Sequence, residues 1–133
     1  MLRRTVADLP PETNKISGKI IDSAFEVHNT LGPGLLEGVY ETCMSYELAK
    51  RGLIFLKQNI LPIQYKDVLL DAALRIDLLV ENQVVVELKA VEKLLPVHEA
   101  QMLTYLKLTK CRLGLLLNFN VPALKTGIKR TIL

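Results

Sequence analysis

Two apolar runs, 76–80 and 84–88, are separated by only three polar residues, and they constrain this chain more than any other feature. Both runs have the valine, isoleucine and leucine content of core strands, yet the first contains Asp77 and the second continues through Glu87 to Lys89. A buried carboxylate needs a partner, because desolvating an unpaired ion is expensive. We therefore expect the three charged residues to form either a salt-bridged network at a sheet edge or part of a divalent metal site.

The length of the intervening loop decides where these charges lie. In an antiparallel hairpin, directly opposed residues share one face of the sheet. A three-residue loop over 81–83 pairs Val80 with Val84. That register sets Asp77 opposite Glu87, whereas a two-residue loop would split the charges across the sheet. The three-residue loop, which we predict, also gathers an entirely apolar layer on the other face: Ile76, Leu78, Val80, Val84, Val86 and Leu88.

The length of 133 residues suits a single domain, which we place at 14–133 after a flexible leader over 1–13. Cys43 and Cys111 lack metal-ligand or redox spacing, and no apolar stretch resembles an export signal or a membrane span. We therefore expect reduced thiols, a cytoplasmic protein and no membrane contact. Half of the residues are hydrophobic, which is compatible with a homodimer or a larger complex but does not require one.

The net charge of +3 is unevenly distributed. All fourteen acidic residues lie at or before Glu99, whereas the segment 101–133 has six basic residues and no acidic one. This asymmetry suits contact with a phosphate backbone, although ordinary solvated lysines are an equal alternative. The candidates for binding nucleic acid are Lys107, Lys110, Arg112, Lys125, Lys129 and Arg130.

Apolar periodicity and turn residues predict an α/β fold. Pro62 indicates a bulge or an edge in the first strand, and the apolar run 112–119 indicates a strand buried on both faces. The order is that of a meander feeding a helical crossover, with a mixed sheet of four to five strands flanked by helices. The expected helices are 14–30, 35–50 and 96–109, and the expected strands are 55–65, 68–80, 84–91, 112–119 and a short last element over 127–132.

Two of these helices carry polar residues at helical spacing. Glu37 and Tyr40 lie three apart on the second helix, where an acidic residue in the first turn also simply complements the helix dipole. On the third helix, His98, Gln101 and Tyr105 form a polar stripe, which is either a solvated face or the border of a site. The stripe expected to face the sheet is Val97, Ala100, Leu103 (or Thr104) and Leu106.

Together these residues resemble a known family. Asp77, nine further residues and then Glu87-x-Lys89 resemble the signature of the PD-(D/E)xK nuclease superfamily, with Ile76 where the superfamily's name has proline. The third helix is similar to the Q-x-x-x-Y motif of RecB-like members. The segment 34–40 resembles the motif that names the GxxExxY proteins, a small prokaryotic branch. The resemblance covers roughly 15–133.

This resemblance implies a restriction-endonuclease-like core with the order αβββαβ. It implies a Mg²⁺ site, for which Mn²⁺ is a possible substitute, with four protein ligands: Glu37, Asp77, Glu87 and the backbone carbonyl of Leu88. Lys89 would orient the attacking water and stabilise developing charge, and Gln101 and Tyr105 would position the phosphodiester or the lysine.

The expected activity is metal-dependent hydrolysis of phosphodiester bonds, with DNA favoured over RNA as substrate. The alternative is a non-catalytic nucleic-acid-binding or assembly module that retains the nuclease fold. A nuclease that is active only in a larger complex is a third hypothesis.

Overall fold

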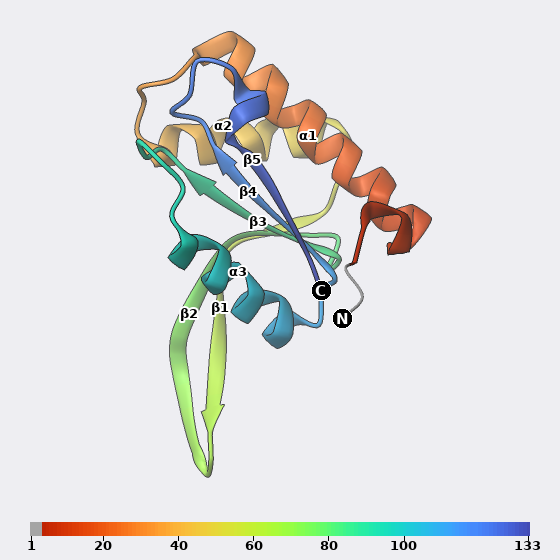
Figure 1. Cartoon of the computed structure of the whole chain (residues 1–133), viewed down its shortest axis with the longest axis vertical. Coiled ribbons are helices and arrows are strands. Elements are labelled where there is room, and N and C mark those ends of the chain that lie inside the picture. The colour runs from red at the N-terminus through yellow and green to blue at the C-terminus, as the bar shows by residue number, and fades with distance from the viewer. Residues whose placement is uncertain (1–3) are drawn as a thin grey trace.

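The computed structural model describes residues 4–133, apart from the side chains of residues 72 and 73. Three α-helices and five strands make up the fold (Figure 1). In chain order the elements are η1 (Val6–Asp8), α1 (Pro11–Leu31), α2 (Glu37–Lys50), β1 (Phe55–Tyr65), β2 (Val68–Val80), β3 (Val84–Lys89), α3 (Pro96–Thr109), β4 (Leu113–Asn118), η2 (Leu124–Gly127) and β5 (Ile128–Ile132).

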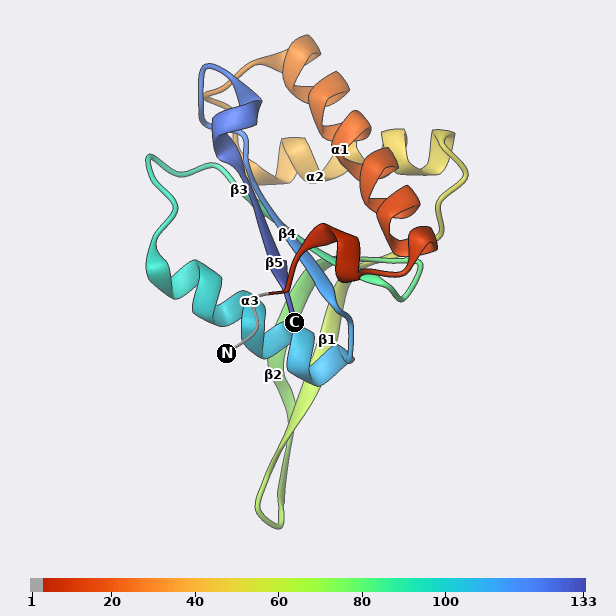
Figure 2. The same ribbon diagram turned by 45° about the vertical axis from the view of Figure 1, so that its right-hand side comes forward.

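The five strands form one mixed sheet in the order β1-β2-β3-β4-β5. All neighbours pair antiparallel except β3 and β4, which run parallel because α3 crosses between them. Helices α1 and α2 cover one face of the sheet and α3 covers the other (Figures 1 and 2). Strand β4 is buried along its whole length, as its apolar run predicted. The mixed, helix-flanked sheet confirms the predicted fold class.

The three-residue loop is confirmed. Val80 pairs with Val84, and the turn closes with the amide of Gln83 donating to the carbonyl of Val80 at 2.9 Å. Glu81 and Asn82 both adopt left-handed backbone conformations with φ near +53° and +54°. Asparagine tolerates this region better than most residues, which suits it to the tip of a tight turn.

Ile76 departs from the predicted apolar layer. The other five members of that layer are buried under α1 and α2, but Ile76 packs with Leu79 and Val85 on the α3 side. The cause lies in β1, where Gln58 has a left-handed φ of 50° and skips its pairing with Asp77. This local distortion breaks the strict alternation of side chains, so the expectation was wrong at that residue.

Residues 1–3 of the predicted leader lie outside the described part, and its residues 6–8 and 11–13 belong to η1 and α1. Helix α1 begins at Pro11, three residues earlier than predicted, because proline is well tolerated at a first helical position. Leu9 is buried in the core. The hydroxyl of Thr13 donates to the side-chain carbonyl of Gln83 at 2.8 Å, which ties this end of α1 to the β2–β3 turn.

Helix α3 faces the sheet with only one residue of the predicted stripe, Leu106, and the rest of that stripe is exposed. Met102, Tyr105 and Leu106 are buried, whereas Val97 is 63% exposed. The helix itself has apolar residues on every side, so their periodicity in the sequence could not indicate which side faces the sheet. Gly114 in β4 completes the docking, because a Cβ atom there would collide with the sulfur atom of Met102.

The β1–β2 hairpin projects beyond the body of the domain (Figures 1 and 2). We call residues 60–75, which begin and end with the Ile60–Arg75 pair, the arm. The register shifts between Leu61 and Ile63, so Pro62 sits at a bulge, and β1 is also an edge strand of the sheet. Both predictions for this proline are confirmed.

Two smaller expectations can be compared with the structure. Cys43 and Cys111 are free thiols, as predicted. Within residues 4–133, no helix combines the length and apolar character needed to cross a membrane.

Candidate active site

Asp77 and Glu87 lie side by side where β2 and β3 leave their regular pairing. The backbone amide of Asp77 donates to Oε2 of Glu87 at 2.8 Å, and the amide of Leu88 donates to Oδ2 of Asp77 at 2.9 Å. The last regular backbone pair is Leu78 with Val86, one position nearer the turn than Asp77 and Glu87. Beyond that pair, the two carboxylates replace backbone carbonyls as hydrogen-bond acceptors and thereby join β2 to β3.

The environment of Glu87 disfavours its charged form. This side chain is only 5% exposed. Burial, followed by the negative charge of Asp77, raises the pKa of Glu87 to about 8, against the opposing effects of the Asp77 amide and Lys89. A bound cation would relieve this repulsion, since an opposite charge nearby favours the ionised carboxylate.

Glu37 approaches the same pair from α2. It is the first residue of that helix and lines a small pocket with Asp77 and Leu88. Burial raises the pKa of Glu37, the positive charge of Lys89 lowers it, and the negative charge of Asp77 raises it further. These influences place Glu37 within electrostatic reach of both the strand carboxylate and the lysine.

Two further polar residues of this pocket escaped the sequence prediction. Nε2 of Gln58 donates to Oε1 of Glu41 at 2.7 Å and to Oδ1 of Asp77 at 3.4 Å. Gln58 therefore holds the second oxygen of Asp77 while bridging to α2. Glu41 follows Glu37 by one helical turn, a spacing that could have revealed it. Gln58 carried no such signal, because its role depends on its left-handed backbone.

Tyr40 supports the loop that leads to Glu37. Its hydroxyl donates to the carbonyl of Gly32 at 2.7 Å and accepts from the amide of Leu35 at 3.2 Å. Its ring is fully buried and stacks on Phe119 with centroids 4.5 Å apart. The loop turns through Gly34 at a φ of 93°, a conformation that favours glycine. The segment 34–40 therefore combines a turn glycine, a pocket carboxylate and a buried tyrosine anchor.

Lys89 is the last residue of β3 and is half-buried. Its carbonyl accepts from the amide of Phe119 at 2.9 Å, which extends the parallel pairing with β4. The side chain of Asn118 makes two hydrogen bonds to the backbone of Val91: it donates to the carbonyl at 2.9 Å and accepts from the amide at 3.1 Å. Asn118 is buried and was not predicted; it fixes the chain just beyond the lysine.

Helix α3 contributes one of its three predicted polar residues to the pair. Burial, and then the charges of Glu87 and Asp77, raise the pKa of Tyr105 to about 12. Gln101 is exposed one turn earlier on the helix. Nδ1 of His98 accepts from the amide of Leu95 at 2.9 Å, so the histidine caps the start of the helix and does not border the pair.

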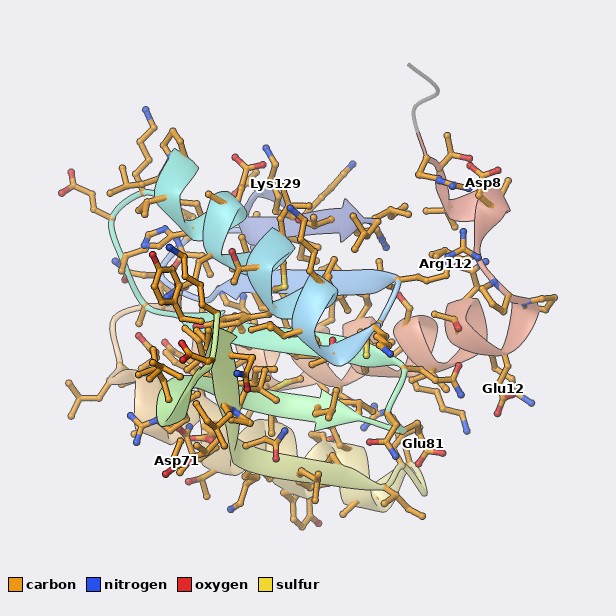
Figure 3. All side chains as sticks on the ribbon, turned by 90° about the horizontal axis from the view of Figure 1, so that it is seen from below. Asp8, Glu12, Asp71, Glu81, Arg112 and Lys129 are labelled. Carbon is orange, nitrogen blue, oxygen red and sulfur yellow. The ribbon has the colours of Figure 1, made fainter. Side chains whose placement is uncertain are left out.

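The predicted basic residues do not form a single surface. Lys129 and Arg130 are neighbours on β5 and therefore point to opposite faces of the sheet. Lys129 lies on the α3 side, where it pairs with Glu99 at 3.2 Å. Arg112 lies beside η1, well separated from Lys129 (Figure 3). Lys107 and Lys110 are exposed near the end of α3, and Lys125 is exposed in η2.

The donors at this site match the chemistry of a hard divalent cation, which prefers carboxylate and carbonyl oxygens. Asp77 and Glu87 provide two adjacent carboxylates, and Glu37 provides a third across the pocket. Among residues 4–133, however, no three acidic, histidine or cysteine side chains converge closely enough to form a complete ion-binding group. The donor types fit a metal, while the full predicted ligand set is not assembled.

Comparison with known proteins identifies the class. The family model described as the PD-(D/E)XK nuclease superfamily matches residues 14–131, nearly the whole chain. The chain therefore belongs to the PD-(D/E)XK nuclease superfamily, as its Asp77, Glu87 and Lys89 pattern predicted. No curated protein and no solved structure matches it.

Proposed function

We propose that this domain is a metal-dependent nuclease of the GxxExxY branch that hydrolyses phosphodiester bonds of nucleic acid, with DNA favoured over RNA. The observation that carries the proposal is the adjacent pair of the half-buried Asp77 and the buried Glu87, each accepting a backbone amide of the other strand, with Lys89 on the same strand as Glu87. Clusters of buried charged groups contribute little net stability, so stability alone does not explain this pair. In a member of a nuclease superfamily, a cation-binding role explains it. The two free thiols support a cytoplasmic location.

The proposed ligands of Mg²⁺, or of Mn²⁺ in its place, are Glu37, Asp77, Glu87 and the backbone carbonyl of Leu88. When bound, the ion would polarise a phosphoryl oxygen and lower the pKa of a coordinated water.

The protein's own groups have separate roles. Lys89 stabilises negative charge that develops on the phosphate. Tyr105 supports Glu87 from α3, and Gln58 fixes the orientation of Asp77 from β1. Gln101, which is exposed one turn before Tyr105, contacts the phosphodiester. The six basic residues of the C-terminal segment hold flanking backbone phosphates from more than one side.

A cleavage assay with purified protein tests this proposal. Single- and double-stranded DNA and RNA are incubated with Mg²⁺ or Mn²⁺ and with the variants Glu87→Gln and Lys89→Ala. We expect wild-type cleavage to depend on the metal and to fall by at least about 100-fold in both variants, in the range typical for loss of an electrostatic catalytic group. Glu12→Gln, an exposed position on α1, is the matched control and should cleave normally. Equal cleavage by all three variants would refute the assignment.

A non-catalytic binding or assembly module is the second candidate. One observation favours it: among residues 4–133 the predicted acidic ligands do not fully converge. Calorimetric titration with Mg²⁺ and Mn²⁺ separates the two readings. Saturable binding that is lost in Asp77→Asn supports the nuclease, whereas absence of binding together with retained affinity for nucleic acid supports the module. Cleavage that appears only after addition of a partner protein would indicate a nuclease active within a larger complex.

A further inference from the structure

The arm carries an apolar face whose outer part no described residue of this chain covers. Cross-strand partners lie on the same side of a hairpin, so the pairs Tyr65–Val68, Ile63–Leu70 and Leu61–Leu74 form one continuous stripe. The inner pair packs against the core beneath α3. The outer residues Tyr65, Val68 and Leu70 are 60%, 51% and 45% exposed. The α3-facing side of the sheet thus continues along the arm after the helix that covers it has ended (Figure 1).

The charge of the arm argues against a nucleic-acid ligand. Its four charged residues are Lys66, Asp67, Asp71 and Arg75, which sum to zero. Phosphate backbones are bound through an excess of positive charge. The tip residues Lys66 and Asp67 carry one charge of each sign and can instead meet their own copies across a two-fold axis, with each charge opposite one of the other sign.

The edge of the arm argues against addition of a further strand. Both strands of the arm are edges, because β3 pairs with β2 only at residues 78–80. On β1, Pro62 lacks an amide hydrogen, and the register shift between the Leu61–Leu74 and Ile63–Leu70 pairs interrupts the ladder of both strands. Both features are known devices that prevent edge-to-edge pairing. The exposed apolar face of the arm, and not its edge, is therefore the surface available to a partner.

The exposed area matches the requirement of a dimer. The chain exposes 8047 Å² of surface. A compact monomer of its mass, 14.9 kDa, exposes roughly 7,000 Å². The excess of about 1,000 Å² is comparable to the surface of about 800 Å² that each partner buries in an interface of standard size.

From these observations we propose that two copies of this chain associate through the apolar faces of their arms, packed against each other around a two-fold axis. The outer residues Tyr65, Val68 and Leu70 form the centre of the contact, and Lys66 and Asp67 at the tip of the arm lie at its rim. The interface goes beyond the proposed nuclease activity and requires neither metal nor nucleic acid.

Sedimentation velocity of the full chain, without metal or nucleic acid, tests the proposal at concentrations from about 1 to 100 µM, where contacts of micromolar affinity are resolved. We expect a dimer whose dissociation constant rises by at least about tenfold in Leu70→Lys, as for a residue at an interface centre. Val68→Lys on the same face should act similarly. Circular dichroism confirms that each variant is folded.

Leu69→Lys is the matched control, because Leu69 neighbours Leu70 on the same strand, is 56% exposed and points to the opposite face. Its dissociation constant should stay within about threefold of the wild-type value, as for a surface change outside the contact. A monomer throughout the concentration range overturns the proposal. Equal weakening by Leu69→Lys and Leu70→Lys overturns the assigned face. Because mass is the readout, failure here is distinguishable from failure of the nuclease assignment.

Discussion

Replacing Tyr40 by phenylalanine removes one oxygen atom from a fully buried ring and tests how the loop before α2 is held. The stacking on Phe119 is retained, so the change isolates the hydroxyl, which bonds the carbonyl of Gly32 and the amide of Leu35. Each hydrogen bond contributes roughly 0.5–1.5 kcal/mol net. Since Gly32 is half-buried and Leu35 is exposed, water can replace part of the lost bonding. We expect a loss of about 1–2 kcal/mol in the free energy of unfolding.

Urea denaturation followed by circular dichroism measures this loss, with Tyr46→Phe as the control. Tyr46 is on the same helix but is 64% exposed, so its variant should stay within about 0.5 kcal/mol of wild type. Hydrogen exchange supplies a local readout: the amide of Leu35 should exchange faster in Tyr40→Phe, because its acceptor is gone. Equal stabilities for the two variants, with unchanged exchange at Leu35, would refute the anchoring role of Tyr40.

Three further predictions concern the sheet and the site. Gly114→Ala should lower the free energy of unfolding by about 1–3 kcal/mol through overpacking. In a double-mutant cycle measured by urea denaturation, Met102→Ala should recover part of this loss. Strictly additive effects would contradict the close contact between Gly114 and Met102. Gln58→Ala should weaken Mg²⁺ binding by about tenfold in calorimetry, as for loss of a group that orients a ligand. The control Gln64→Ala, on the exposed arm, should leave Mg²⁺ affinity unchanged. Unchanged affinity in Gln58→Ala would show that Asp77 is oriented without the side-chain amide of Gln58. Because the pKa of Glu87 is raised from 4.5 to about 8 in the fold, the folded state binds more protons than the unfolded state between these values, so without divalent ions stability should fall as pH rises from 5 to 8. Glu87→Gln should flatten this dependence, and identical slopes in urea titrations at several pH values would contradict the perturbed ionisation.

The hairpin and its charges could be predicted because two independent constraints coincide. Only a three-residue loop both gathers the apolar residues and brings Asp77 to Glu87, so the Val80–Val84 pairing followed from the sequence. The strand and helix limits around it followed from proline, glycine and apolar runs. The superfamily assignment rested on the same residues.

Other features depend on tertiary context that a linear pattern does not contain. The left-handed backbone of Gln58 redirects Ile76, and nothing in the neighbouring residues indicates it. The buried face of α3 is selected by the space that Gly114 leaves in β4. The N-terminal segment is held by the buried Leu9 and by the hydrogen bond from Thr13 to Gln83, a residue distant in sequence. Lys129 and Arg130 lie on opposite faces because they are successive residues of β5, and the other basic residues come from α3 and its end, η2 and the turn before β4.

The bonds that the carboxylates of Asp77 and Glu87 accept from backbone amides affect how mutations at this site are interpreted. Each carboxylate serves as an acceptor for the partner strand, so an alanine at either position removes a charge and also orphans a backbone amide. Inactivity of such a variant would mix lost chemistry with fraying of the hairpin. Asparagine and glutamine remove the charge and keep one acceptor oxygen for that amide; at Asp77 the other oxygen becomes a donor, which costs only the longer 3.4 Å contact from Gln58. In this protein, isosteric amides therefore separate catalysis from folding where alanine scanning cannot.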